Sequence, residues 1–186
     1  MWEALYAAWV ISEIGISLFT RSRRATPGHQ HHDRGSLLIL WPVILASISF
    51  GTWYGQAHAP DFFSNRSDAA RVGIALLVIG LVIRWVAIFK LGRRFTANVV
   101  IQQDQRVETS GLFRFVRHPS YTGLLIIFSG IALNTRSWIG AAIVIVPISL
   151  ALLYRIHVEE AALSNAFGEE YRSYCRSTKR LIPGVF

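Results

Sequence analysis

The chain has 186 residues, of which 52% are hydrophobic and only 16% are charged, and its formal net charge is +8. Soluble domains average about 25% charged residues, so this composition excludes a disordered chain, a collagen and a coiled coil, and it disfavours a soluble globule. The single cysteine, Cys175, excludes an internal disulfide and a multi-cysteine zinc site. We therefore expect an integral membrane protein with one domain over residues 1–186.

Five apolar stretches predict about five transmembrane helices in an all-α fold. The stretches are 2–19, 37–54, 69–89, 121–133 and 138–154. A helix needs about 20 residues to cross about 30 Å of hydrocarbon, and the first three stretches reach or approach that length. The fourth is short, and only N-T-R-S separates it from the fifth. This pattern predicts a tight helical hairpin for the last two spans.

The spans divide the predicted domain into two parts. Residues 1–90 contain three spans, and residues 91–186 contain the other two together with the longest polar segments. After Tyr154 the spacing of apolar and acidic residues predicts an amphipathic C-terminal helix at the cytoplasmic face. Gly168 is the candidate end of that helix.

The basic residues predict the orientation. If the chain crosses the membrane five times, fifteen of its nineteen Lys and Arg residues fall on one side. The positive-inside rule makes that side cytoplasmic, which places the N-terminus outside and the C-terminus inside. Because topology explains most of the positive charge, we expect contact with membrane lipids and no nucleic-acid partner.

The residues that precede the fourth span are the first candidates for a binding site. Pro119 suits the first turn of a helix and disfavours helical torsions at His118. One interpretation is a proline-started helix with interfacial anchors. The other is that His118, Ser120, Tyr121 and the helix N-terminus bind an anionic group of a small cofactor. The residues alone leave both interpretations open.

Arg155 and Glu159 are the second candidates. Four residues separate them, so they share one face of a helix, where a surface ion pair contributes about 0.3–0.5 kcal/mol. Arg155 directly follows an apolar run, however, and ionisable groups at that depth tend to face a bundle interior or a cavity. We favour a functional pair, because arginine can hold a carboxylate and glutamate can hold a cation or a ribose hydroxyl.

Two further polar features receive no function. We expect Arg84 to extend its side chain toward the membrane surface, with a buried polar role as the alternative. His29, His31 and His32 are expected to lie in a solvated loop, and no metal is predicted. The sequence lacks the motifs of dinucleotide-binding folds, P-loop enzymes, zinc proteases and α/β-hydrolases.

Three motifs in the second half of the chain occur at a distinctive spacing. They are R-H-P-S-Y at 117–121, E-E at 159–160 and F-G-E-E-Y at 167–171, and T-K-R-L-I-P-G follows at 178–184. Together they resemble the isoprenylcysteine carboxyl methyltransferase family, which belongs with the membrane phospholipid methyltransferases. The resemblance covers about residues 95–186. R-H-P-x-Y alone is shared with membrane sterol reductases that use NADPH.

The resemblance implies an S-adenosylmethionine-dependent O-methyltransferase of the protein-S-isoprenylcysteine type, with its active site at the cytoplasmic membrane face. It implies a lipophilic substrate that enters from the bilayer and is methylated on a carboxylate. Arg155 matches the position that binds the substrate carboxylate and, with Glu159, is the predicted catalytic pair. Cofactor binding carries over to Gln102, Gln105, Arg106, Val107, Glu108, Phe113, His118, Pro119, Ser120, Tyr121 and Glu159.

Two positions depart from the family pattern, and three other functions remain open. Phe113 stands where tyrosine is usual, so it can provide a ring contact but no hydroxyl, and Glu108 stands where an apolar residue is common. A phospholipid amine N-methyltransferase would need a base such as His118. An NADPH-dependent sterol-type reductase is the second alternative. A non-catalytic membrane protein, with Arg155 and Glu159 used for packing, is the third.

Overall fold

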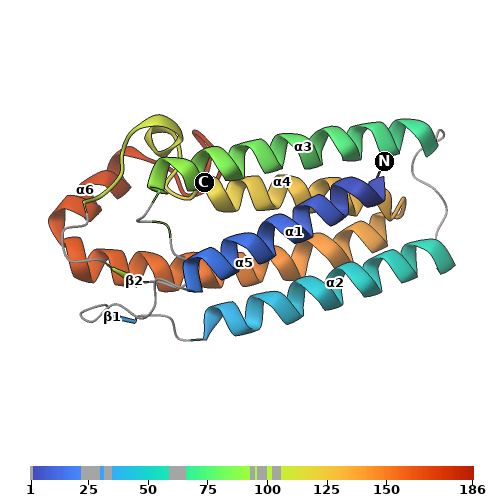
Figure 1. Ribbon diagram of the computed structural model, residues 1–186, viewed down its shortest axis with the longest axis horizontal. Coiled ribbons are helices and arrows are strands. Elements are labelled where there is room, and N and C mark those ends of the chain that lie inside the picture. Colours follow the sequence, from blue (N-terminus) through green and yellow to red (C-terminus); the bar gives the residue numbers. More distant parts are fainter. Residues whose placement is uncertain are drawn as a thin grey trace.

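The computed structural model describes residues 2–21, 30–31, 35–58, 66–92, 95, 100–101 and 106–186. In chain order its elements are α1 (Trp2–Arg21), β1 (Gln30–His31), α2 (Ser36–His58), α3 (Arg66–Leu91), β2 (Val100–Ile101), the 3-10 turn η3 (Gly111–Arg114), α4 (Pro119–Asn134), α5 (Trp138–Phe167) and α6 (Glu169–Ser177). Helices α1–α5 lie lengthwise in an elongated bundle, and α6 lies at one end of it (Figure 1).

The helices follow the predicted spans, with one difference. The amphipathic helix expected after residue 154 is not separate, because α5 continues through it to Phe167. Gly168 then ends α5 with φ 53° and ψ −123°, a conformation that favours glycine, and the short α6 follows. The predicted all-α fold is confirmed, and outside the helices β1 and β2 form a two-residue antiparallel pair.

Several helices have the length and composition of membrane spans. Three of the described helices qualify, at Ser36–His58, Ser67–Leu91 and Trp138–Phe167, and Pro119–Asn134 is a shorter apolar helix. A chain with three such helices is a multi-pass integral membrane protein. The number of five crossings, the orientation and the division at residue 90 remain predictions.

Glycines bring the helices together in two close pairs. A Cβ atom on Gly80 of α3 would lie 2.6 Å from the carbonyl oxygen of Gly123 in α4. Likewise, a Cβ atom on Gly51 of α2 would lie 2.8 Å from the carbonyl oxygen of Gly140 in α5. Small residues at such crossings let helix backbones approach closely, which is how membrane helices gain packing energy without hydrophobic exclusion of water.

The predicted hairpin between α4 and α5 is confirmed. Thr135 caps the end of α4 by donating its hydroxyl to the carbonyl of Ala132 at 2.7 Å. Arg136 adopts the left-handed conformation with φ 59°, and the Ser137 hydroxyl accepts from the N–H of Gly140 at 3.1 Å. Three residues thus reverse the chain at the end of the bundle opposite α6 (Figure 1).

The C-terminal segment packs against the residues that precede α4. The N–H groups of Arg117 and His118 donate to the carbonyls of Lys179 and Arg180 at 2.8 and 3.1 Å. The Thr122 hydroxyl donates to another carbonyl of the same segment at 2.8 Å. These hydrogen bonds to the C-terminal segment hold the start of α4 in place.

Candidate active site

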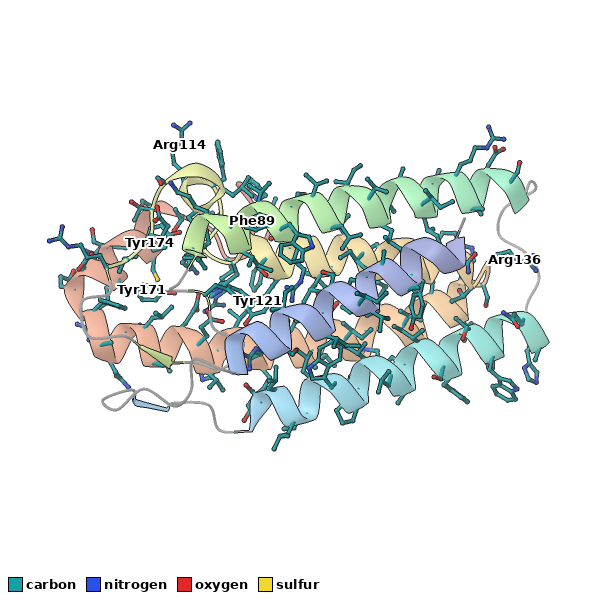
Figure 2. The ribbon with its side chains drawn as sticks, viewed as in Figure 1. Phe89, Arg114, Tyr121, Arg136, Tyr171 and Tyr174 are labelled. Atoms are coloured by element: carbon teal, nitrogen blue, oxygen red, sulfur yellow. The ribbon has the colours of Figure 1, made fainter. Side chains whose placement is uncertain are left out.

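A large cavity occupies the end of the bundle near α6. The space between its walls is about 1380 Å³, including open solvent at its mouth. Residues from all five long helices, α6 and the segment before α4 line it. Figure 2 shows Tyr121, Tyr171 and Tyr174 at this end of the bundle and Arg136 at the other.

The cavity brings together ten of the twelve residues predicted for the site. They are Arg106, Val107, Glu108, Phe113, His118, Pro119, Ser120, Tyr121, Arg155 and Glu159. The other two, Gln102 and Gln105, lie outside the described residues. Segments separated by about fifty positions in the sequence therefore line one cavity.

Tyr121 links the two charged residues of the α5 pair. The Arg155 Nε donates to the Tyr121 hydroxyl at 3.0 Å, and that hydroxyl donates to Glu159 Oε2 at 2.7 Å. The Arg155 Nη1 also donates to the hydroxyl of Ser36 at 2.7 Å. Arg155 is only 3% exposed, so the pair is not the surface ion pair that was the alternative.

Glu160 is the centre of a separate cluster. Its Oε1 accepts from Arg117 Nε at 2.8 Å and lies 3.3 Å from His118 Nε2. Its Oε2 accepts from Arg180 Nε at 3.0 Å. Arg117 additionally donates to the backbone carbonyls of Cys175 and Thr178. The cluster fastens α5, α6 and the C-terminal segment around His118.

A buried ion pair between α1 and α3, at the cavity wall, was not predicted. Arg84 donates to Glu13 through Nε at 2.5 Å and through Nη2 at 2.7 Å. Its Nη1 donates to the Ser120 hydroxyl at 2.7 Å. Arg84 is 6% exposed, so the expectation that it extends to the membrane surface is wrong and the buried alternative is correct. The sequence feature that could have indicated this pair is a charged residue within the apolar run of each of the two helices.

Aromatic side chains form much of the cavity lining near α6. Phe95, Phe167, Tyr171 and Tyr174 line the cavity with Phe113, and none of the first four was assigned to the site from sequence. The F-G-E-E-Y motif was the available signal, because it contains Phe167 and Tyr171. Planar rings of this kind suit a flat heteroaromatic ligand.

Tyr174 fixes the turn that presents Phe113. Its hydroxyl donates to the carbonyl of Phe113 at 2.6 Å. Burial raises the pKa of Tyr174 to about 12, so the phenol stays protonated and keeps donating at neutral pH. Before the turn, the Ser110 hydroxyl donates to Glu108 Oε1 at 2.6 Å. The loop that lines the cavity therefore has defined hydrogen bonds at both ends of η3.

An apolar groove between α1 and α2 joins the cavity. Its space is about 670 Å³, including open solvent. The residues that line both spaces are Trp9, Glu13, Ser17, Trp41 and Ile44. The remaining lining is Tyr6, Val10, Ile14 and Leu45. A ligand with a polar head and a hydrocarbon tail could therefore occupy both spaces at once.

Metal ligands are not gathered in the described part of the chain. No group of three or more His, Cys, Asp and Glu side chains there has a metal-binding arrangement. His29 and His32 lie outside the described residues, and His31 belongs to β1.

Comparison with known sequences identifies one family. The sequence model of the isoprenylcysteine carboxyl methyltransferase family matches residues 73–165. Protein-S-isoprenylcysteine O-methyltransferase A of Arabidopsis thaliana is 32% identical over 115 residues, which cover 61% of this chain and 58% of that protein. A probable protein-S-isoprenylcysteine O-methyltransferase of Oryza sativa subsp. indica is 35% identical over 120 residues, 61% of each chain. The matched parts thus span little more than half of these relatives.

A solved structure shares the fold. The eukaryotic intramembrane Ras methyltransferase ICMT matches with a TM-score of 0.57 and 21% sequence identity. The match covers 82% of this chain and 53% of the other. It therefore extends the likeness beyond residues 73–165 at the level of helix arrangement.

Proposed function

Because the chain belongs to the isoprenylcysteine carboxyl methyltransferase family, we propose that it methylates a carboxylate on a lipophilic, isoprenylcysteine-like substrate. S-adenosylmethionine is the proposed methyl donor, and the enzyme class is the protein-S-isoprenylcysteine O-methyltransferases. The observation that carries this proposal is the arrangement of Arg155, Tyr121 and Glu159 in one cavity.

Arg155 is suited to hold the substrate carboxylate. Tyr121 and Ser36 accept hydrogen bonds from its guanidinium and fix the orientation of that group at the cavity wall. A carboxylate is ionised at neutral pH and is already nucleophilic, so its methylation needs no general base. It needs alignment of two reactants at near-contact distance, and a fixed guanidinium in a shielded site supplies that alignment.

The donor set of the cavity fits S-adenosylmethionine. Glu159 and Glu108 offer carboxylates for ribose hydroxyls or an ammonium group, and Arg106 offers a cation for the amino-acid carboxylate. The aromatic lining, which includes Phe113, offers faces for a purine. When bound, the cofactor would supply an electrophilic methyl group. His118 and Tyr121, at the start of α4, would help to hold it.

The groove between α1 and α2 supports a lipophilic substrate. Its lining is almost entirely apolar, and Glu13 is among the residues where it meets the main cavity. A hydrocarbon tail in the groove would place an attached carboxylate in the cavity that Arg155 lines. Such a substrate would enter laterally from the bilayer through the groove, whereas the cofactor would enter through the cavity mouth.

We place the cavity mouth at the cytoplasmic face. Arg106, Arg114, Arg117, Arg172, Arg176, Lys179 and Arg180 all belong to segments at that end of the bundle. The positive-inside rule then puts the end with α6 in the cytoplasm.

Titration calorimetry of the detergent-solubilised protein tests the cofactor. We expect saturable binding of S-adenosylhomocysteine and none of NADPH. Binding of NADPH alone would replace the proposal by the reductase alternative, and binding of neither would support the non-catalytic alternative.

A methyl-transfer assay tests the acceptor. Labelled S-adenosylmethionine is offered with N-acetyl-S-farnesylcysteine or with phosphatidylethanolamine. We expect label on the carboxylate probe and a large loss of that label in Arg155→Ala. Transfer to the amine lipid alone would identify the N-methyltransferase alternative instead.

A further inference from the structure

Helix α1 contributes a narrow buried stripe to the site. Its side chains at Trp9, Glu13 and Ile16, spaced four and three residues apart, are 2%, 5% and 5% exposed. All three line the cavity. Figure 1 shows α1 crossing the bundle obliquely, in front of α5. The position of α1 therefore determines the shape of one cavity wall, although α1 lies outside the segment 73–165 that the family model matches.

The Glu13–Arg84 ion pair fixes where α1 lies. Both oxygens of Glu13 bind Arg84, and the side chains are 6% and 7% exposed. A charged pair at this depth has a large desolvation cost, and a well-supported use of buried polar groups is to select one register between helices. The two-pronged Glu13–Arg84 bond can select one register of α1, because a one-residue slip of the helix would rotate the Glu13 side chain by about 100° away from Arg84.

The same arginine reaches the first turn of α4. Its Nη1 donates to the Ser120 hydroxyl at 2.7 Å, so one guanidinium joins α1, α3 and α4. Glu13 also stands where the apolar groove meets the cavity. A change in the register of α1 would therefore alter the place where the groove, which would hold the tail of a substrate, meets the cavity, which would hold its head.

We propose that Glu13 and Arg84 are positioning residues that fix α1 as the substrate-side wall, and that this wall sets the fit of the lipophilic acceptor. The inference rests on the proposed function of the cavity. Glu13 binds no group of α4, α5 or α6 in the hydrogen bonds of the described residues, so its effect passes through Arg84. The affinity of the acceptor, and not that of the cofactor, depends on the pair.

Calorimetry on Glu13→Gln tests the inference through binding rather than turnover. The acceptor probe is N-acetyl-S-farnesylcysteine, titrated into protein saturated with S-adenosylhomocysteine. We expect the acceptor Kd to rise roughly tenfold and the S-adenosylhomocysteine Kd to stay within about twofold. The control Ile11→Ala lies on the same helix at a side chain that is 68% exposed, and should change neither value. Equal losses for both ligands, or no loss for either, would overturn the inference.

The exchange variant Glu13→Arg with Arg84→Glu separates pairing from general damage. It restores opposite charges at the same two positions, so we expect the acceptor Kd to recover to within about threefold of the wild-type value. A double variant as weak as Glu13→Gln would contradict a role in pairing. This comparison also covers the case in which Glu13→Gln folds poorly because Arg84 is left uncompensated.

Hydrogen exchange gives a readout that does not depend on the acceptor. In Glu13→Gln the amides of α1 should exchange faster, while those of α4 and α6 keep their protection. Unchanged exchange in α1 would overturn the inference whatever the substrate is. Absence of methyl transfer in the wild-type protein would instead refute the proposed function. The hydrogen-exchange result would still decide whether the Glu13–Arg84 pair fixes α1.

Discussion

Glu159 and Glu160 are consecutive residues of α5, yet their carboxylates bind two separate sets of groups. Glu159 accepts from Tyr121 at 2.7 Å, next to Arg155. Glu160 accepts from Arg117 and Arg180 and lies beside His118. Successive residues of a helix point about 100° apart, so the E-E motif serves two surfaces of one helix. We propose that Glu159 binds ligand and that Glu160 holds the site together.

Glu160→Gln should lower stability more than Glu159→Gln. It leaves Arg117, whose side chain is 10% exposed, without a carboxylate, and such a loss costs on the order of 3 kcal/mol. The midpoint of thermal unfolding in detergent should therefore fall clearly. Glu170→Gln, at an exposed position of α6, serves as the control and should leave the midpoint unchanged. A stable Glu160→Gln protein would show that the cluster contributes little.

Tyr121→Phe should impair methyl transfer while the protein stays folded. The change removes the hydroxyl that accepts from Arg155 and donates to Glu159. Both charged groups then lose a fixed partner, and we expect kcat/KM for the carboxylate probe to fall roughly tenfold. Initial rates at saturating cofactor measure this. Tyr154→Phe is the matched control, because Tyr154 is 42% exposed on the same bundle.

Tyr174→Phe should destabilise the protein by about 1–2 kcal/mol at neutral pH, because the buried carbonyl of Phe113 loses its donor. The pKa of Tyr174 is raised by burial to about 12, above its unfolded value near 10. Its contribution is therefore fully present below about pH 10 and is lost as the pH rises through 12. Unfolding midpoints of the two proteins should differ by a constant amount between about pH 6 and 9. A difference that shrinks within that range would contradict the assignment.

The sequence was sufficient for the helices and for ten residues of the cavity lining, but not for the larger part of that lining. Long apolar runs must be helical in a membrane, since every backbone group needs a partner there. His118 and Glu159 were recognised because their motifs resemble those of a known family. The sequence did not predict that α5 continues as one helix beyond residue 154. The hydrophobic pattern changes there, whereas the helical backbone does not.

The pairing of Glu13 with Arg84 could not be derived from one sequence. The two residues are separated by 71 positions, and nothing local indicates which charge a buried arginine will meet. The same holds for Arg117, whose partner Glu160 is 43 positions away. Such contacts depend on how the helices pack, which the hydrophobic pattern of each helix leaves undetermined.

Accessibility of introduced cysteines tests the orientation. In a Cys175→Ser background, Ser173→Cys places a thiol at an exposed position of α6, and Asp68→Cys places one at the opposite end, in the first turn of α3. We expect a membrane-impermeant maleimide to label position 68 in right-side-out vesicles, and position 173 only after permeabilisation. The reverse pattern would place the cavity mouth outside the cell.

Gly80→Ala should weaken both the bundle and the site. Its new Cβ would lie 2.6 Å from the backbone carbonyl of Gly123, which cannot move aside as a flexible side chain could. Overpacking of this kind costs about 1–3 kcal/mol. Because α3 also carries Arg84, which binds both Glu13 and Ser120, separation of α3 from α4 would shift the wall formed by α1, so acceptor affinity should fall along with stability. Gly15→Ala in α1 is the matched control, since its Cβ would have no neighbour within 4 Å and alanine favours a helix. Thermal unfolding and calorimetry on both variants measure the two effects. Equal stability of the Gly80 and Gly15 variants would mean that the α3–α4 contact adjusts without cost.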